Sequence, residues 1–146
     1  MQTGIPLSAW HQRVNEGGIA DCVDIQQVAL LPRDRAPLHQ RLEVRLDLML
    51  SSGLVDEVRS LHSRSDLHLD LPSMRSVGYR QAWQYLEGEL DETDMRQNIL
   101  VATRQLAKRQ TTWLRGWDEL KIIDTLDEKG NWRTLKDFAP ECLKFL

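Results

Sequence analysis

Basic residues are concentrated in one segment of the chain that holds no acid. Between Met95 and Trp117 there is no Asp or Glu, although the whole chain carries 22 acidic and 19 basic residues. The basic residues of this segment are Arg96, Arg104, Lys108, Arg109 and Arg115. Surface helices ordinarily interleave acids with Lys and Arg at four-residue spacing, because such pairs stabilise a helix. In a helix without such acids the Lys and Arg side chains repel one another, and a polyanion such as RNA would relieve that repulsion.

Helical periodicity groups the charges of this segment on one side. At 100° per residue, one narrow stripe holds Arg104, Lys108, Thr111 and Arg115. The opposite side, expected to face the core, holds Met95, Ile99, Ala102, Leu106 and Trp113. We interpret the stripe as a surface that contacts phosphate or RNA. The alternative, in which it is only the solvated face of an ordinary helix, stays open.

A second basic group lies in the stretch Leu71–Gln81, which reads LPSMRSVGYRQ. Gly78 permits a close backbone approach or a positive φ, and a helix is expected to begin there. The free N–H groups and positive dipole of a helix N-terminus, joined by the guanidinium groups of Arg75 and Arg80, suit a phosphate. The alternative is a plain loop whose arginines pair with nearby acids (Asp66, Asp70 or Glu87). The residues by themselves favour neither interpretation.

Other residues that could do chemistry give weaker patterns. Asp56 and Glu57 fall on the surface of an expected helix, where carboxylates are usually solvated. The four histidines (His11, His39, His62 and His68) show no metal-ligand spacing. His39, beside an apolar helix start, is expected to pack or cap rather than act as a base. The chain contains no GxxxxGK[ST] phosphate-binding loop.

The elements that must position these residues are mostly helices. Apolar periodicity and end signals predict helices over Leu38–Leu50 (ended by Gly53), Leu54–His62, Gly78–Leu86 and a long one from Asp91 or Thr93 to Leu114, ended by Gly116. Weaker signals predict a short helix near Ser8, a turn over Asp127–Asn131 and a last helix from Thr134 that contains Pro140.

Short apolar runs predict two strands. One is the later half of Val23–Leu31, and the other is Leu120–Asp124. Two short strands do not form a stable sheet by themselves. They either pair in a minimal sheet covered by helices or belong to a larger sheet whose other strands are absent. We favour the larger sheet.

Composition fits a single domain in a reducing compartment. The 146 residues are 41% hydrophobic and 28% charged, which is ordinary for a globular protein. No apolar run reaches the roughly 18 residues of a membrane helix, so we expect no membrane partner. Cys22 and Cys142 form no CxxC pair, which favours a cytoplasmic chain. The net charge of −3 excludes bulk affinity for nucleic acid, so any RNA contact must be a local patch.

Several stretches resemble signature sequences of one enzyme family. Leu71–Gln81 and Ala102–Arg115 (ATRQLAKRQTTWLR) are similar to stretches of tRNA dimethylallyltransferases, and Leu38–Leu42, Met49–Gly53 and Glu57–Leu61 agree with that family in order and spacing. The resemblance covers about residues 1–124 and leaves residues 125–146 as an unassigned tail. It implies an α/β fold. Residues 1–124 would be the mostly helical C-terminal portion of a P-loop-like parallel-sheet transferase, incomplete and with two short strands.

The resemblance also implies a reaction and its partners. A dimethylallyl group passes from dimethylallyl diphosphate to N6 of the adenosine at tRNA position 37, beside the anticodon, with Mg²⁺ on the diphosphate. The target base must be flipped out to be reached. The resemblance implies that the partner is the tRNA anticodon stem-loop, and that the full-length enzyme is monomeric and cytoplasmic. The positions implied to touch tRNA or border the reaction channel are Arg75, Ser76, Val77, Gly78, Tyr79, Arg80, Arg104, Lys108, Arg109, Gln110, Thr111, Thr112, Trp113, Leu114 and Arg115.

One departure from the family pattern limits this expectation. The family's phosphate loop and its general-base aspartate lie N-terminal to the matched region, so no catalytic residue is assigned in this chain. Mg²⁺ would be bound mainly by that other half, and we expect the chain alone to be inactive. A rival hypothesis is a stand-alone tRNA- or RNA-binding module without catalysis. A weaker one is a helical interaction domain whose basic stripe meets an acidic protein.

Overall fold

The computed structural model describes residue 23, residues 25–118 and residues 120–144. Within these ranges the elements are β1 (Val28–Leu31), α2 (Arg35–Ser51), α3 (Leu54–His62), α4 (Tyr79–Leu86), α5 (Glu92–Arg115), β2 (Lys121–Asp124) and α6 (Leu135–Leu143). The expected mostly helical chain with two short strands is therefore confirmed. The short helix expected near Ser8 lies outside the described residues.

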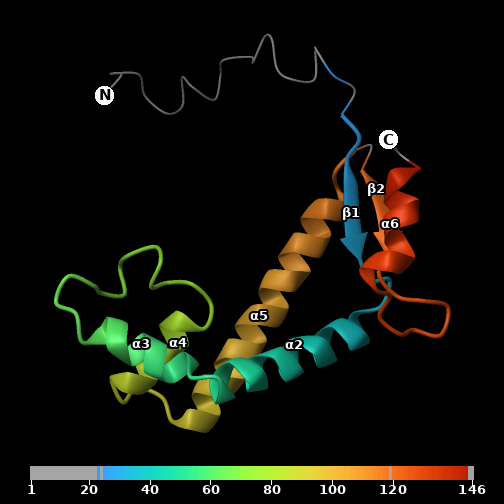
Figure 1. The fold of residues 1–146 in the computed structure, drawn as a ribbon. Coiled ribbons are helices and arrows are strands. Elements are labelled where there is room, and N and C mark those ends of the chain that lie inside the picture. The colour runs from blue at the N-terminus through green and yellow to red at the C-terminus, as the bar shows by residue number, and fades with distance from the viewer. Residues whose placement is uncertain (1–22, 24, 119, 145–146) are drawn as a thin grey trace, which may run out of the picture.

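The two strands lie side by side and pair in parallel (Figure 1), with Val28 opposite Lys121 and Leu31 opposite Asp124. Ala29 and Ile123 are buried where the strands meet. The two paired strands are thus separated in sequence by the helices α2 to α5. The last helix, α6, packs on β2. The larger sheet that we favoured stays a prediction.

The four helices between the strands enclose the main core. Its buried residues are Leu46, Leu54, Val58, Met74, Ala82, Trp83, Met95, Ile99 and Leu100. α2 and α4 each pack on α5, and α3 lies against α4 (Figure 1). This core holds α2 and α5 next to each other, and the basic stripe of α5 lies where they meet.

Local capping explains where these helices begin and end. Asp34 caps α2 by accepting a hydrogen bond from the Ala36 N–H at 3.0 Å, and Asp91 caps α5 by accepting from the Asp94 N–H at 2.8 Å. Gly53 adopts a φ of 97° between α2 and α3, a left-handed conformation that glycine reaches without steric cost. Of the two expected caps of the long helix, Asp91 is thus correct and Thr93 is wrong.

The residues after β2 fold back on the strand pair. The predicted turn closes with the Asp127 N–H donating to the Asn131 carbonyl at 2.8 Å, and Leu126 then bridges Trp132 in antiparallel fashion. α6 forms although it contains Pro140. This tail packs closely on the strand that precedes it. The domain boundary expected at Asp124 stays a prediction.

No helix in the part of the chain that the structure describes is both long enough and apolar enough to cross a membrane.

Candidate nucleic-acid interface

The basic stripe of α5 borders one edge of the core face. Leu100, four residues before Arg104 and so only about 40° from it around the helix, is buried with 3% of its surface exposed. Arg104 itself is only partly exposed and faces Glu43 of α2. The core face runs from Met95 through Ile99 to Leu100. The expected burial of Met95 and Ile99 opposite the stripe is confirmed, but the core face is wider than expected and reaches Leu100 beside the stripe.

Two residues expected in the core are exposed. Leu106 is 38% exposed and Trp113 is 64% exposed, and the Trp113 ring lies 4.7 Å from that of Trp117 at a tilt of 59°. The 24 residues of α5 extend about 36 Å at 1.5 Å per residue. All three fully buried residues of α5 fall in its first nine positions. The periodicity identified an apolar side correctly, but the described residues do not cover that side along its whole length.

The acids that are absent from Met95–Arg115 of α5 are supplied by α2. Arg96 donates to Asp47 through Nε at 2.7 Å and contacts Glu43 at 3.4 Å, while Arg104 Nη2 lies 3.6 Å from Glu43 Oε2. The hydrogen bond from Arg96 lowers the pKa of Asp47, and the two acids together raise the pKa of Arg96. The solvated-face alternative thus accounts for Arg96 and in part for Arg104.

The other basic residues of α5 are not neutralised in this way. Within the described ranges, no ion pair is formed by Lys108, Arg109 or Arg115. Three cations on one helix therefore stay available to an anion.

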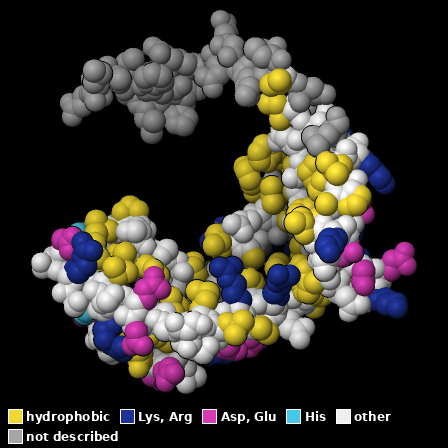
Figure 2. All heavy atoms as spheres, in the orientation of Figure 1, with side chains coloured by type: hydrophobic (Ala, Val, Ile, Leu, Met, Phe, Trp, Pro, Cys, Tyr) yellow, Lys and Arg dark blue, Asp and Glu magenta, His cyan; other side chains and the backbone are white. Residues whose placement is uncertain are grey.

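A pocket of about 180 Å³ lies between the start of α2 and the middle of α5. It is lined by Arg35, Leu38, His39, Arg104, Gln105, Ala107, Lys108 and Thr111. Its walls carry three permanent cations and no acid. Figure 2 shows Lys and Arg side chains beside apolar ones in the hollow of the face that it presents. Converging cations over a partly apolar floor are suited to hold a phosphate group and to contact an adjoining base or sugar.

One buried polar atom at this pocket has no partner. Arg104 Nε is buried and makes no hydrogen bond within the described structure. The Thr111 hydroxyl is already committed, because it donates to the Ala107 carbonyl at 2.9 Å. A buried N–H without an acceptor is costly. An anion that enters the pocket close to Arg104 could supply that acceptor.

Sequence reasoning missed the half of the pocket that α2 contributes. Arg35 stands in the first turn of α2, and no pattern in the sequence connects it to α5. His39 was expected to pack or cap, but Asp34 is the cap and His39 lines the pocket. The contact of α2 with α5 creates this site, and tertiary packing sets that contact.

The loop before α4 behaves largely as the plain-loop alternative predicted. Arg75 donates to Asp70 Oδ1 at 3.0 Å and to the Leu69 carbonyl at 3.2 Å, and the Ser76 hydroxyl donates to the Ser73 carbonyl at 2.8 Å. Arg75 is thus occupied by local partners. A phosphate would have to displace Asp70 in order to reach it.

The start of α4 is closed by its own residues. Gly78 is buried with a φ of 99°, and its N–H donates to the Gln81 side chain at 3.0 Å. Val77 packs against the core, and the Tyr79 hydroxyl donates to Glu57, a contact that raises the pKa of Tyr79. The conformation expected for Gly78 is confirmed. Gln81 thus satisfies the N–H of Gly78, and the Arg80 N–H donates to the Ser76 carbonyl at 3.1 Å, so these two N–H groups are not free for a phosphate.

The remaining predicted positions lie on the open surface. Arg80 borders a shallow hollow between α4 and α5 together with Gln84, Asn98 and Gln105. Another hollow is lined by Gln105, Lys108, Arg109, Thr112 and Trp113. Gln110 and Arg115 are exposed, and Leu114 is half-buried. The structure therefore brings together only Arg104, Lys108 and Thr111 of the predicted set in the pocket, and distributes the others around it.

The described residues offer no donor set for a divalent cation. Nowhere in these ranges do three or more His, Cys, Asp or Glu side chains converge. Mg²⁺ prefers several oxygen ligands in octahedral geometry. We therefore assign none of the described residues to Mg²⁺.

A parallel strand pair joined by packed helices is an α/β arrangement. The family model of IPP transferases matches residues 1–117, so the chain belongs to the IPP transferase family, the tRNA prenyltransferases.

Two solved structures are similar in fold. The full-length tRNA isopentenylpyrophosphate transferase from Bacillus halodurans superimposes with a TM-score of 0.66 at 27% identity, covering 81% of this chain and 39% of that one. The tRNA delta(2)-isopentenylpyrophosphate transferase from Staphylococcus epidermidis gives a TM-score of 0.63 at 23% identity, covering 80% of this chain and 36% of that one. The chain therefore spans well under half the length of the transferases it matches.

Proposed function

We propose that this chain is the tRNA-contacting part of an enzyme that transfers a dimethylallyl group from dimethylallyl diphosphate to N6 of the adenosine next to the tRNA anticodon. The family match and the names of the two similar structures support tRNA as the substrate class. The family model matches residues 1–117, a range that includes α2 and α5, the two helices that form the pocket.

The observation that carries this proposal is the pocket between α2 and α5. Arg35, Arg104 and Lys108 converge there without an acid in the lining, and Arg104 Nε lacks a partner among the described residues. Phosphate contacts of this kind position a nucleic acid but do not read its sequence. In the proposed mechanism these residues hold the backbone of the anticodon loop while the target base is turned out of its stack.

The chemical step needs groups that we do not assign to this chain. The diphosphate leaving group must be stabilised by donors placed where its charge develops. The sequence has no phosphate-binding loop of the GxxxxGK[ST] type. We therefore expect the chain by itself to bind tRNA without transferring the prenyl group. Turnover above background with dimethylallyl diphosphate, Mg²⁺ and tRNA would contradict this assignment.

The experiment that tests the interface is tRNA affinity across a salt series. Replacing both Arg35 and Lys108 by Gln removes two cations from the pocket, and should lower the log–log salt slope by about one to two units. The matched control replaces Arg59 and Lys129 by Gln, which removes the same charge from exposed positions outside the pocket. Equal slopes in the pocket variant and the unmodified chain would refute the interface.

A further inference from the structure

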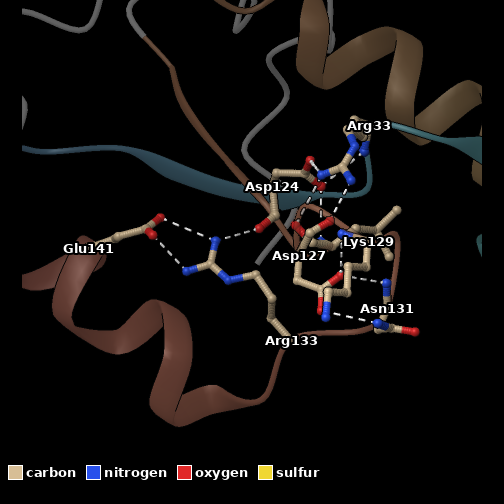
Figure 3. A network of polar contacts seen from close by, with 8 residues as sticks. Arg33, Asp124, Asp127, Lys129, Asn131, Arg133 and Glu141 are labelled. Carbon is tan, nitrogen blue, oxygen red and sulfur yellow. Dashed lines mark hydrogen bonds and ion pairs between the residues drawn. The ribbon is translucent and has the colours of Figure 1, made fainter.

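The tail, defined as residues Thr125–Lys144, and the end of β2 hold Arg33, two residues before α2. The Asp124 carboxylate accepts from the Arg33 backbone N–H at 3.1 Å and from Arg33 Nη1 at 2.7 Å. The same guanidinium donates to the Leu126 carbonyl at 3.2 Å and to the carbonyl of Asp127. Figure 3 shows Arg33 pointing into the bend that follows β2. The entry to α2 is therefore fixed by four hydrogen bonds to residues some ninety positions further along the chain.

A second arginine makes this anchor rigid. Arg133 donates to the Asp124 carbonyl at 2.9 Å and to Glu141 Oε1 at 2.6 Å (Figure 3). It also donates to the Asp137 carbonyl at 2.8 Å. Its side chain is only 15% exposed, so these charge-assisted bonds are screened less than ordinary surface pairs. Arg133 thus ties α6 to the end of β2, to which Arg33 is also bound.

The tail contacts α2 again two turns later. The Arg41 guanidinium lies over the Trp132 ring, 4.6 Å from its centroid. Arg41 and Glu43 are about 200° apart around α2, hence on opposite sides of the helix. Trp132 therefore supports α2 from one side, while Arg96 and Arg104 of α5 hold Glu43 on the other.

The α2 wall of the pocket lies between these two contacts. Arg35 and His39 stand between Arg33 and Arg41 in the sequence, and no residue of the tail lines the pocket. We propose that the tail is a positioning element that fixes the first turns of α2 and so sets the distance between Arg35 and Lys108 across the pocket. The effect of this positioning on tRNA binding rests on the proposed function. The tail lies beyond the residues that match the family model.

One arm of the test needs no RNA and uses amide hydrogen exchange in the full chain. Trp132→Ala and Arg33→Gln should each speed the exchange of the amides from His39 to Leu42 by about tenfold, because local opening of this turn becomes easier. Trp132→Phe keeps a ring under Arg41 and should restore slow exchange. The matched control for Arg33 is Arg64→Gln, which breaks an exposed ion pair with Asp66. Exchange that stays unchanged in both Trp132→Ala and Arg33→Gln overturns the positioning role.

The second arm measures binding of a short RNA hairpin with the sequence of a tRNA anticodon stem-loop. Trp132→Ala alters no charge. It should weaken binding of the hairpin about three- to tenfold, because the α2 wall of the pocket that Lys108 lines would no longer be held in place. Its effect should therefore be smaller in a chain that already carries Lys108→Gln. Independent, multiplying effects would mean that the tail acts elsewhere and would overturn the proposal. No effect of Lys108→Gln by itself contradicts the proposed function instead, and the exchange data then decide on the tail.

Discussion

Arg104 and Glu43 face each other across the contact between α5 and α2, with Arg104 Nη2 3.6 Å from Glu43 Oε2. Glu43 also lies 3.4 Å from Arg96, so one carboxylate is shared by two guanidinium groups. This sharing leaves Arg104 incompletely neutralised, and its buried Nε has no partner in the described ranges. Arg104 thus lines the pocket with its charge only partly neutralised.

Glu43→Gln should strengthen tRNA binding. An acid about 6 Å from a bound phosphate repels it by roughly 0.7 kcal/mol in water, so its removal should improve affinity about threefold at low salt. The cost in stability should stay below about 1 kcal/mol, because the ion pairs are partly exposed. Fluorescence anisotropy with labelled tRNA measures the affinity. Asp56→Asn on α3, which removes a charge outside the pocket, is the control and should have a smaller effect. Weaker binding by Glu43→Gln would show that Glu43 supports the pocket instead of competing with the phosphate.

Gly78→Ala should destabilise the chain by about 1 to 2 kcal/mol, because alanine is strained at a φ of 99°. Space is not the obstacle, since a Cβ would meet only Leu54 Cδ2 at 4.0 Å. Gly116→Ala is the matched control, because its φ is −90° and its Cβ would make ordinary contacts of 3.6 and 3.7 Å. Urea unfolding measures both variants. Equal midpoints for the two would contradict the strain argument.

The contribution of Tyr79 to stability should disappear at alkaline pH. The neutral phenol donates to Glu57, whereas the phenolate would be repelled by it, so the pKa of Tyr79 is raised above its ordinary value. A raised pKa in the folded state means that the stabilisation is complete below about pH 10 and is lost as pH rises through the folded pKa. The free energy of unfolding of the unmodified chain should therefore approach that of Tyr79→Phe above pH 10. A difference that stays constant from pH 8 to pH 11 would contradict a raised pKa of Tyr79 in the folded state.

Short-range signals predicted most of the fold. The helix over Leu54–His62 was predicted with its observed bounds, because Gly53 before it marks a chain reversal that depends only on local conformation. Asp91 capped the long helix for the same reason. The sequence left open whether the two strands pair in a minimal sheet or belong to a larger sheet whose other strands are absent. Strand partners distant in sequence are selected by packing, and the apolar runs themselves do not indicate which neighbour they will take.

The candidate site was predictable only in part. The basic, acid-free segment Met95–Trp117 indicated the helix that carries Lys108, and the structure places this residue in a pocket. The sequence did not reveal that Glu43 and Asp47 would supply the missing acids, since they lie on another helix. For the same reason Arg35 and His39 were not assigned to the site. Each of these contacts joins residues about fifty or more positions apart.

The sequence by itself determined the helices and strands and the charge that each one carries. Helix periodicity, caps and composition are properties of residues close together in the chain. Tertiary structure alone decided which side of α5 is buried. Leu106 and Trp113 have the same periodicity as Ile99, yet Ile99 is covered by packed helices and the other two are exposed. A side chain is buried only where another element lies over it, and that depends on how α2 and α4 pack against α5.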